Sequence, residues 1–129
     1  MTGAKLRVVL ADDTHEYRLL LKLVLEQDGR FEIVGEAADG EQAVAVASAE
    51  QPDAVVLDLA MPVMDGLEAI PGIRSGAPGA AIVVLSGFAR GRLDRKVLEL
   101  GADAYVEKGE AFSKIVSTLL EASSARVVA

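Results

Sequence analysis

The 129-residue chain contains no cysteine and no tryptophan, and aromatic residues make up only 4% of it. Without cysteine there can be no disulfide framework, no thiolate zinc site and no cysteine nucleophile. The absence also fits a reducing cytoplasm, where we expect the protein to reside. No run of about 18 apolar residues occurs, and residues 1–7 hold no long apolar stretch, so we expect neither a membrane span nor a signal peptide.

Basic residues are outnumbered as well. The 13 Lys and Arg oppose 20 Asp and Glu, which leaves a formal net charge of −7. Binding to nucleic-acid phosphates depends on Lys and Arg, and so does attraction to an anionic membrane. We therefore expect no direct nucleic-acid binding by this domain and no membrane association. The length predicts one domain, and the 51% hydrophobic content excludes a disordered chain.

Short apolar runs alternate with amphipathic segments along the chain. The runs predict five strands, each followed by a helix with apolar residues at helical spacing; they lie at 6–11, 31–35, 54–57, 81–85 and 104–106. This alternation predicts an α/β fold, a five-stranded parallel sheet with helices on both faces. We expect the domain to cover residues 1–122 and residues 123–129 to form a short, loose C-terminal tail.

The sequence also indicates where two of the helices begin. Asp13 and Glu16 have the spacing of a capping box, which predicts Asp13 as the cap of the first helix. Asp65 and Gly66 are interpreted as the entry to the third helix. His15, the single histidine, is interpreted as a surface residue.

Polar groups follow four of the five predicted strands. The first strand ends at Asp12 and Asp13, the third at Asp58, the fourth at Ser86 and the fifth near Lys108. Ligands of an open parallel sheet bind beyond the carboxyl ends of its strands. Each of these residues alone has an ordinary explanation as a cap, a turn residue or a surface charge. Their arrangement along one edge favours a functional site.

Three carboxylates at one sheet edge need a counter-charge. At about 4 Å and an effective dielectric of about 20, each pair repels by about 4 kcal/mol. A hard divalent cation such as Mg²⁺ relieves this repulsion best. Lys108 can pair with Asp58 or with an incoming anion, and Ser86 can donate to a phosphoryl oxygen. These groups suit phosphoryl transfer, in which a carboxylate can itself be the nucleophile.

With these residues in view, residues 5–121 resemble the receiver domain of bacterial two-component response regulators. The most specific segment is DLAMPVMDG at 58–66, which looks like the segment that begins with the phospho-accepting aspartate of that family. Five further residues fall at positions that the family uses: Asp12, Asp13, Ser86, Tyr105 and Lys108.

The resemblance implies roles for the acidic residues. Asp58 is expected to accept the phosphoryl group from a histidine kinase. Asp13 and Asp58 are expected to bind Mg²⁺ directly, with Asp12 acting largely through water and the backbone carbonyl of Ala60 completing the protein ligands. The fold implied is flavodoxin-like, with strand order 2-1-3-4-5.

The resemblance also implies a switch. Lys108 is expected to hold a phosphoryl oxygen, Ser86 to move toward that group and Tyr105 to swing inward behind it. The face made by the fourth helix, the fifth strand and the fifth helix would report the state to a downstream protein or an output domain, or form a homodimer. In this reading the chain is not an enzyme beyond its own phosphorylation and dephosphorylation.

Three departures from the family pattern stand out. Gly109 replaces the usual proline after the lysine, so we expect a trans or mobile loop and a less firmly aimed Lys108. Pro71 lies inside the third predicted helix, where it should kink or shift the helix. Ala60 and Phe88 occupy positions that tune phosphoryl lifetime in the family, and a bulky Phe88 is expected to hinder attacking water.

Two alternative functions stay open. One is a degenerate receiver that binds proteins without phosphorylation, for which Gly109 is the only support. The other is a small Mg²⁺-dependent phosphatase with an aspartyl nucleophile, although such hydrolases usually carry Asp-x-Asp where this chain has adjacent acids. The sequence of residues 12–58 looks most like receivers of DNA-binding regulators. This slightly favours the interpretation that the chain is a fragment of such a regulator and not a stand-alone protein.

Overall fold

Strands and helices alternate along the chain, as the apolar pattern predicts. The computed structural model describes residues 4–87 and 92–128. Its elements are β1 (Leu6–Ala11), α1 (His15–Asp28), β2 (Phe31–Ala37), α2 (Gly40–Glu50), β3 (Ala54–Leu57), α3 (Gly66–Gly76), β4 (Ala81–Ser86), α4 (Arg92–Leu100), β5 (Ala104–Glu107) and α5 (Phe112–Val128).

The five strands form one parallel sheet in the order β2-β1-β3-β4-β5, which confirms the predicted fold class and strand order. β1 and β3 are neighbours although a whole strand–helix unit separates them in the sequence. In their register Ala11 is opposite Leu57, so the residues that follow these two strands leave the sheet side by side. The chain therefore brings Asp12 and Asp58 together by topology alone.

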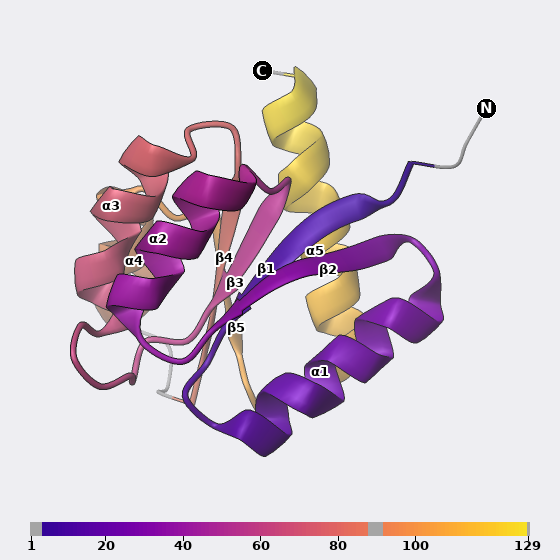
Figure 1. Cartoon of the computed structure of the whole chain (residues 1–129), viewed down its shortest axis with the longest axis horizontal. Coiled ribbons are helices and arrows are strands. Elements are labelled where there is room, and N and C mark those ends of the chain that lie inside the picture. Colours follow the sequence, from indigo (N-terminus) through magenta and orange to yellow (C-terminus); the bar gives the residue numbers. More distant parts are fainter. Residues whose placement is uncertain (1–3, 88–91, 129) are drawn as a thin grey trace.

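Alternate residues of each strand enter two separate apolar layers, because successive side chains of a strand point to opposite faces. Val9 and Val55 pack with α2, α3 and α4, whereas Val8 and Val56 pack with α1 and α5. Figure 1 shows these two groups of helices on opposite faces of the sheet. All residues of β3 and β4 are buried, as expected for central strands of a sheet covered on both faces.

The entry to α1 differs from the prediction. Asp13 is not the cap: Thr14 occupies the N-cap position, and its carbonyl accepts the first helical bond from the N–H of Arg18. The acidic pair remains outside the helix because the side chain of Asp12 accepts from the N–H of Thr14 and so holds the turn. The interpretation of Asp65 is confirmed, since it caps α3 in a capping box with Glu68.

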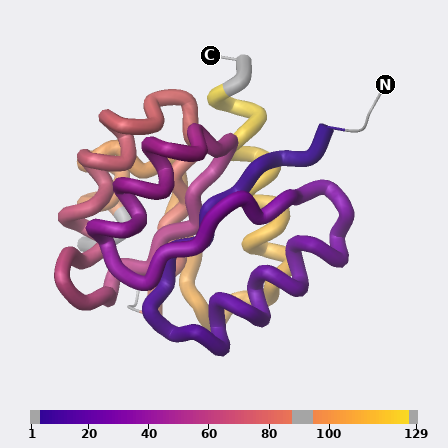
Figure 2. The backbone as a smooth tube through the Cα atoms, in the orientation of Figure 1, coloured from indigo at the N-terminus to yellow at the C-terminus, as the bar shows by residue number. Residues whose placement is uncertain are grey.

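The expectation of a loose tail at 123–129 is wrong for residues 123–128, which continue α5 to Val128. Ser123 is buried, and Arg126 donates to Asp103 and to the carbonyl of Pro78. These contacts extend the helix because they tie its last turns to the loops that precede β4 and β5. Figure 2 shows the last turns of α5 at the same end of the molecule as the start of β1.

Other boundaries shift little. β2, β4 and β5 run one or two residues beyond their apolar runs, to Ala37, Ser86 and Glu107. α3 contains Pro71 and continues to Gly76 without a break. None of the helices in the described part of the chain is long and apolar enough to cross a bilayer.

The start of α3 packs tightly against the end of β3. Gly66 donates its N–H to the carbonyl of Leu59, and a Cβ at this glycine would lie 2.3 Å from the carbonyl oxygen of Asp58. Glycine is thus required for the close approach of two backbone segments. The same contact fixes the main chain on which the Asp58 side chain stands.

Substitution of Gly66 by alanine should therefore lower the free energy of unfolding by about 1–3 kcal/mol, because the added methyl group overpacks against backbone. Gly79→Ala is the matched control, since a Cβ there meets nothing within 4 Å. That control should change stability by less than about 1 kcal/mol. Urea unfolding of both variants measures the difference, and equal effects would contradict the close packing at Gly66.

Candidate phosphoryl and metal site

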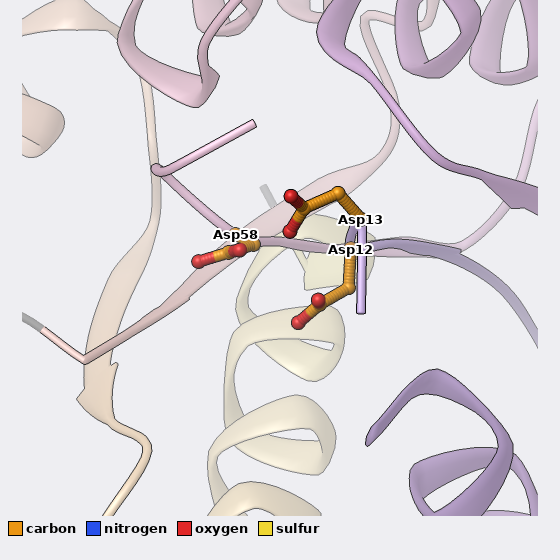
Figure 3. Close-up of side chains that lie close together, drawn as sticks. All are labelled: Asp12, Asp13 and Asp58. Atoms are coloured by element: carbon orange, nitrogen blue, oxygen red, sulfur yellow. The ribbon is translucent and has the colours of Figure 1, made fainter. Parts of the chain in front are cut away.

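Three carboxylates meet at the carboxyl edge of the sheet. Asp12 and Asp13 follow β1, and Asp58 follows the adjacent strand β3. One carboxylate oxygen from each lies within 4.8 Å of the others. Figure 3 shows the three side chains turned toward a common region. The convergence predicted from the strand ends is thus present in the fold.

The three acids have different environments. Asp12 and Asp58 are only 5% and 4% exposed, whereas Asp13 is exposed to solvent. Burial, followed by the negative charge of Asp12, raises the pKa of Asp58 above its ordinary value; the charge of Lys108 and a hydrogen bond from the N–H of Ala60 oppose this rise. The site therefore holds a buried carboxylate that is poorly neutralised by the protein alone.

Lys108 supplies the positive charge. Its Nζ lies 2.8 Å from Oδ2 of Asp12 and 3.5 Å from Oδ2 of Asp58. Burial lowers the pKa of Lys108, but the hydrogen bond to Asp12 and the charges of the two aspartates outweigh it, so that the pKa is raised overall. Lys108 was expected to pair with Asp58 or with an incoming anion, and its shortest contact with a carboxylate is with Asp12.

Gly109 does not prevent this placement. The peptide bond between Lys108 and Gly109 is trans, and the N–H of Lys108 donates to the carbonyl of Ser86 at 2.8 Å. The ammonium reaches two carboxylates from there. The expectation of a less firmly aimed lysine is therefore not reflected in its contacts.

Asp12 and Asp13 differ in the hydrogen bonds that their carboxylates accept. Oδ1 of Asp12 accepts from the N–H of Thr14 and Oδ2 accepts from Lys108, so both of its oxygens have protein donors. The carboxylate of Asp13 accepts no hydrogen bond within residues 4–87 and 92–128. Asp13 thus has more oxygen lone pairs available to a ligand than Asp12 has, whereas Asp58 accepts from the N–H of Ala60 and lies near Lys108.

A hollow of about 380 Å³ opens over the acids. It is lined by Asp13, Thr14, Asp58, Ala60, Gly87 and Lys108. Ser86, the last residue of β4, is fully buried directly before Gly87. The hollow is therefore open to solvent and is lined by carboxylates, by Ala60 and by the side chain of Lys108.

The remaining predicted residues lie around this centre. Tyr105 is half-buried on β5 and packs against the apolar layer under α2, α3 and α4. His15 is exposed, as interpreted from the sequence, with Nδ1 3.4 Å from the guanidinium of Arg18. Phe88, expected to hinder attacking water, lies outside the described residues.

Sequence reasoning missed Tyr17, which it interpreted only as one apolar residue of the first helix. The Nζ of Lys108 lies 4.6 Å from the centroid of the Tyr17 ring. Burial is the main cause that raises the pKa of Tyr17, and its hydroxyl also experiences the charges of Lys108 and the buried acids. No spacing rule could indicate this pair, because α1 and the end of β5 meet only in the folded chain.

Such a set of groups can bind a divalent cation and a phosphoryl group together. Carboxylate and carbonyl oxygens are the ligands that Mg²⁺ prefers, and a lysine ammonium is a suitable point charge for a phosphoryl oxygen. The carboxylate of Asp58, which accepts a hydrogen bond from the backbone N–H of Ala60, can act as a nucleophile toward phosphorus.

The model of the response regulator receiver domain matches residues 8–120 of this chain. The chain belongs to the response regulator receiver family. It is a receiver domain of two-component signalling, with the five-stranded fold of that family.

Individual relatives agree with this placement. Chemotaxis protein CheY of Halobacterium salinarum is 36% identical over 102 residues, which cover 79% of this chain and 83% of that protein. The receiver domain of the response regulator NarL of Mycobacterium tuberculosis superposes with a TM-score of 0.88 at 30% identity, covering 93% of this chain and 97% of that one. A response regulator of Burkholderia pseudomallei that carries a phosphorylated aspartic acid has a TM-score of 0.83 at 26% identity, covering 95% and 70%.

Several curated relatives are much longer than this receiver domain. The match spans 27% and 29% of two protein-glutamate methylesterases, from Maricaulis maris and Caldanaerobacter subterraneus. It spans 54% of the transcriptional regulatory protein PdtaR of Mycobacterium tuberculosis. The chain therefore spans less than a third of the two methylesterases and about half of PdtaR.

The raised pKa of Asp58 has a consequence for stability. The native state binds this proton more tightly than the unfolded chain does, so the ionised carboxylate costs stability as the pH rises above the ordinary value of 3.8. Without Mg²⁺, Asp58→Asn should therefore increase the free energy of unfolding at pH 7, and the gain should shrink toward pH 4. Urea unfolding at both pH values measures this; a gain that is absent, or that grows in acid, would contradict it.

Proposed function

We propose that this receiver domain accepts a phosphoryl group on Asp58 from the phosphohistidine of a histidine kinase. The observation that carries the proposal is the convergence of Asp58 with two further carboxylates and the Lys108 ammonium in one hollow. The phosphorylated aspartic acid of the relative from Burkholderia pseudomallei supports the same chemistry for this fold.

The donor set fits Mg²⁺. Asp13 and Asp58 offer carboxylate oxygens within 4.8 Å of each other, and Ala60 lines the same hollow with its backbone. We propose these three residues as the protein ligands, with Asp12 acting largely through water, since Asp13, Asp58 and Ala60 line the hollow and Asp12 is held by Thr14 and Lys108. When bound, the ion neutralises charge on the carboxylates and on the phosphoryl oxygens.

In the transfer step a carboxylate oxygen of Asp58 attacks the phosphorus of phosphohistidine. An O–P bond forms as the P–N bond breaks, and the electron pair of that bond stays on the imidazole nitrogen, which takes up a proton from solvent. The N–H of Ala60 orients the attacking carboxylate. Lys108 is within reach of the new phosphoryl oxygens, because its Nζ already lies 3.5 Å from Asp58.

The phosphoryl group adds charge and strong acceptors at the edge of the sheet. We propose that it draws in Lys108, which follows β5, and the hydroxyl of Ser86 at the end of β4, and that Tyr105 follows inward. Both strands end at this edge, and the backbone N–H of Lys108 is bonded to Ser86, so the two respond as one unit. The α4–β5–α5 face then reports the phosphorylated state.

The proposed partners are a histidine kinase and either a downstream protein or an output domain. A homodimer through the α4–β5–α5 face is a further proposed assembly. The net charge of −7 disfavours direct contact of this domain with nucleic acid. We place its function in the cytoplasm, where a kinase and its receiver share one compartment.

The two alternatives have weaker support. A degenerate receiver was suggested only by Gly109, yet Lys108 reaches both buried carboxylates. An aspartyl phosphatase usually carries two acids that alternate with another residue, whereas Asp12 and Asp13 are adjacent and differ in burial.

Phosphorylation is tested directly by intact mass. With Mg²⁺ and acetyl phosphate, the chain should gain the mass of one phosphoryl group, and Asp58→Asn should gain none because its amide is not a nucleophile. Asp53→Asn is the matched control, since this exposed aspartate lies just before β3 at the opposite edge of the sheet. A wild-type chain that gains no mass, or an Asp58→Asn variant that gains as much, would contradict the proposal.

The switch is tested with Lys108→Ala. This variant should still bind Mg²⁺, because it keeps all three carboxylates, but should lose most of the backbone amide shifts that Mg²⁺ and beryllofluoride induce around β4 and β5. Lys114→Ala removes the same charge from the exposed surface of α5 and should respond like wild type. Wild-type shift changes in Lys108→Ala would exclude its role in the switch.

A further inference from the structure

The ammonium of Lys108 is bounded on three sides. Asp12 lies 2.8 Å from it and Asp58 lies 3.5 Å from it. On the third side is the face of the Tyr17 ring, with the centroid 4.6 Å from Nζ. A cation at this distance is attracted by the negative face of an aromatic ring.

The ring itself is held in place. Tyr17 lies on α1 and packs into the apolar layer under α1 and α5. The ring of Phe112, the first residue of α5, is 6.3 Å away from it at an interplanar angle of 32°. The Tyr17 ring is therefore packed between α1 and α5 and is not a free surface side chain.

The loop after β5 gives the lysine side chain little guidance of its own. Gly109 follows it, and a Cβ at that position would meet nothing within 4 Å. The backbone of Lys108 is anchored by Ser86, but four rotatable bonds separate that anchor from the ammonium. Contacts outside the loop must therefore set the direction of the aliphatic part of the Lys108 side chain.

We propose that Tyr17 is a positioning residue that holds the Lys108 ammonium beside Asp12 and Asp58 through the face of its ring. This inference deepens the proposed function, because it concerns the lysine that would hold the phosphoryl group. Tyr17 acts through Lys108 and need not touch the phosphoryl group.

The Tyr17 hydroxyl separates this role from ordinary packing. It is buried and has no hydrogen-bond partner within residues 4–87 and 92–128. Removing it therefore breaks no hydrogen bond in the described structure, and Tyr17→Phe keeps the π face intact. Tyr17→Leu keeps an apolar side chain but removes the π face. The pair isolates the ring as the element under test.

Two measurements on the 129-residue chain test the role. The first is the rate of phosphorylation by acetyl phosphate with Mg²⁺: Tyr17→Leu should be about 3–10-fold slower, and Tyr17→Phe within about twofold of wild type. The second is the NMR shift of the Lys108 Cε protons, which the ring current displaces in wild type and Tyr17→Phe but not in Tyr17→Leu.

A packing control and a double mutant complete the design. Ile33→Ala removes volume from the same apolar layer on β2, away from the site, and should leave both readouts unchanged. In a Lys108→Ala background, Tyr17→Leu should slow phosphorylation no further, because the residue through which it acts is gone.

Three results would overturn the inference: Tyr17→Phe as slow as Tyr17→Leu, a Lys108 resonance that is the same in all variants, or a Tyr17→Leu effect no larger than that of Ile33→Ala. A wild-type chain that takes up no phosphoryl group refutes the proposed function instead. The Lys108 proton shifts then decide the placement by themselves, since they need no phosphorylation.

Discussion

The central interaction of the site is the pairing of one lysine ammonium with two buried carboxylates. Asp12 and Asp58 leave adjacent parallel strands with almost no exposure to water, and Lys108 reaches both from the end of β5. One positive charge cannot neutralise three acids. The remaining negative charge makes the hollow suited to a divalent cation. It also suits a group whose oxygens can accept hydrogen bonds from Lys108 alongside the carboxylates.

The rest of the fold serves to hold these groups in register. The close approach of Gly66 to the carbonyl of Asp58 fixes the main chain at the end of β3. The bond from Lys108 to the Ser86 carbonyl joins the ends of β4 and β5. At the opposite edge, Arg126 and Arg74 both pair with Asp103 and tie α5 and α3 to the sheet. These ion pairs lie at the end of the sheet away from the acids, whereas the charge change occurs at the carboxyl ends of the strands.

Much of this arrangement follows from the sequence, because two local signals combine. Apolar runs predicted the strands, and parallel topology then brought Asp12, Asp13, Asp58, Ser86 and Lys108 to one edge. What failed depended on tertiary contacts. Asp13 does not cap α1, since the side chain of Asp12 holds the turn and Thr14 takes the cap. Residues 123–128 are helical because Arg126 finds a partner in Asp103. The Tyr17–Lys108 contact leaves no trace in periodicity or spacing.

The convergence of the carboxylates on one ligand is tested most directly by a crystal structure of the chain grown with Mg²⁺ and beryllofluoride. Our interpretation predicts density for one ion among the oxygens of Asp13, Asp58 and the Ala60 carbonyl. It also predicts beryllofluoride on the Asp58 carboxylate within hydrogen-bond distance of the Lys108 Nζ. An ion bound away from these residues, or an Asp58 carboxylate free of beryllofluoride while Lys108 stays on Asp12, would contradict it.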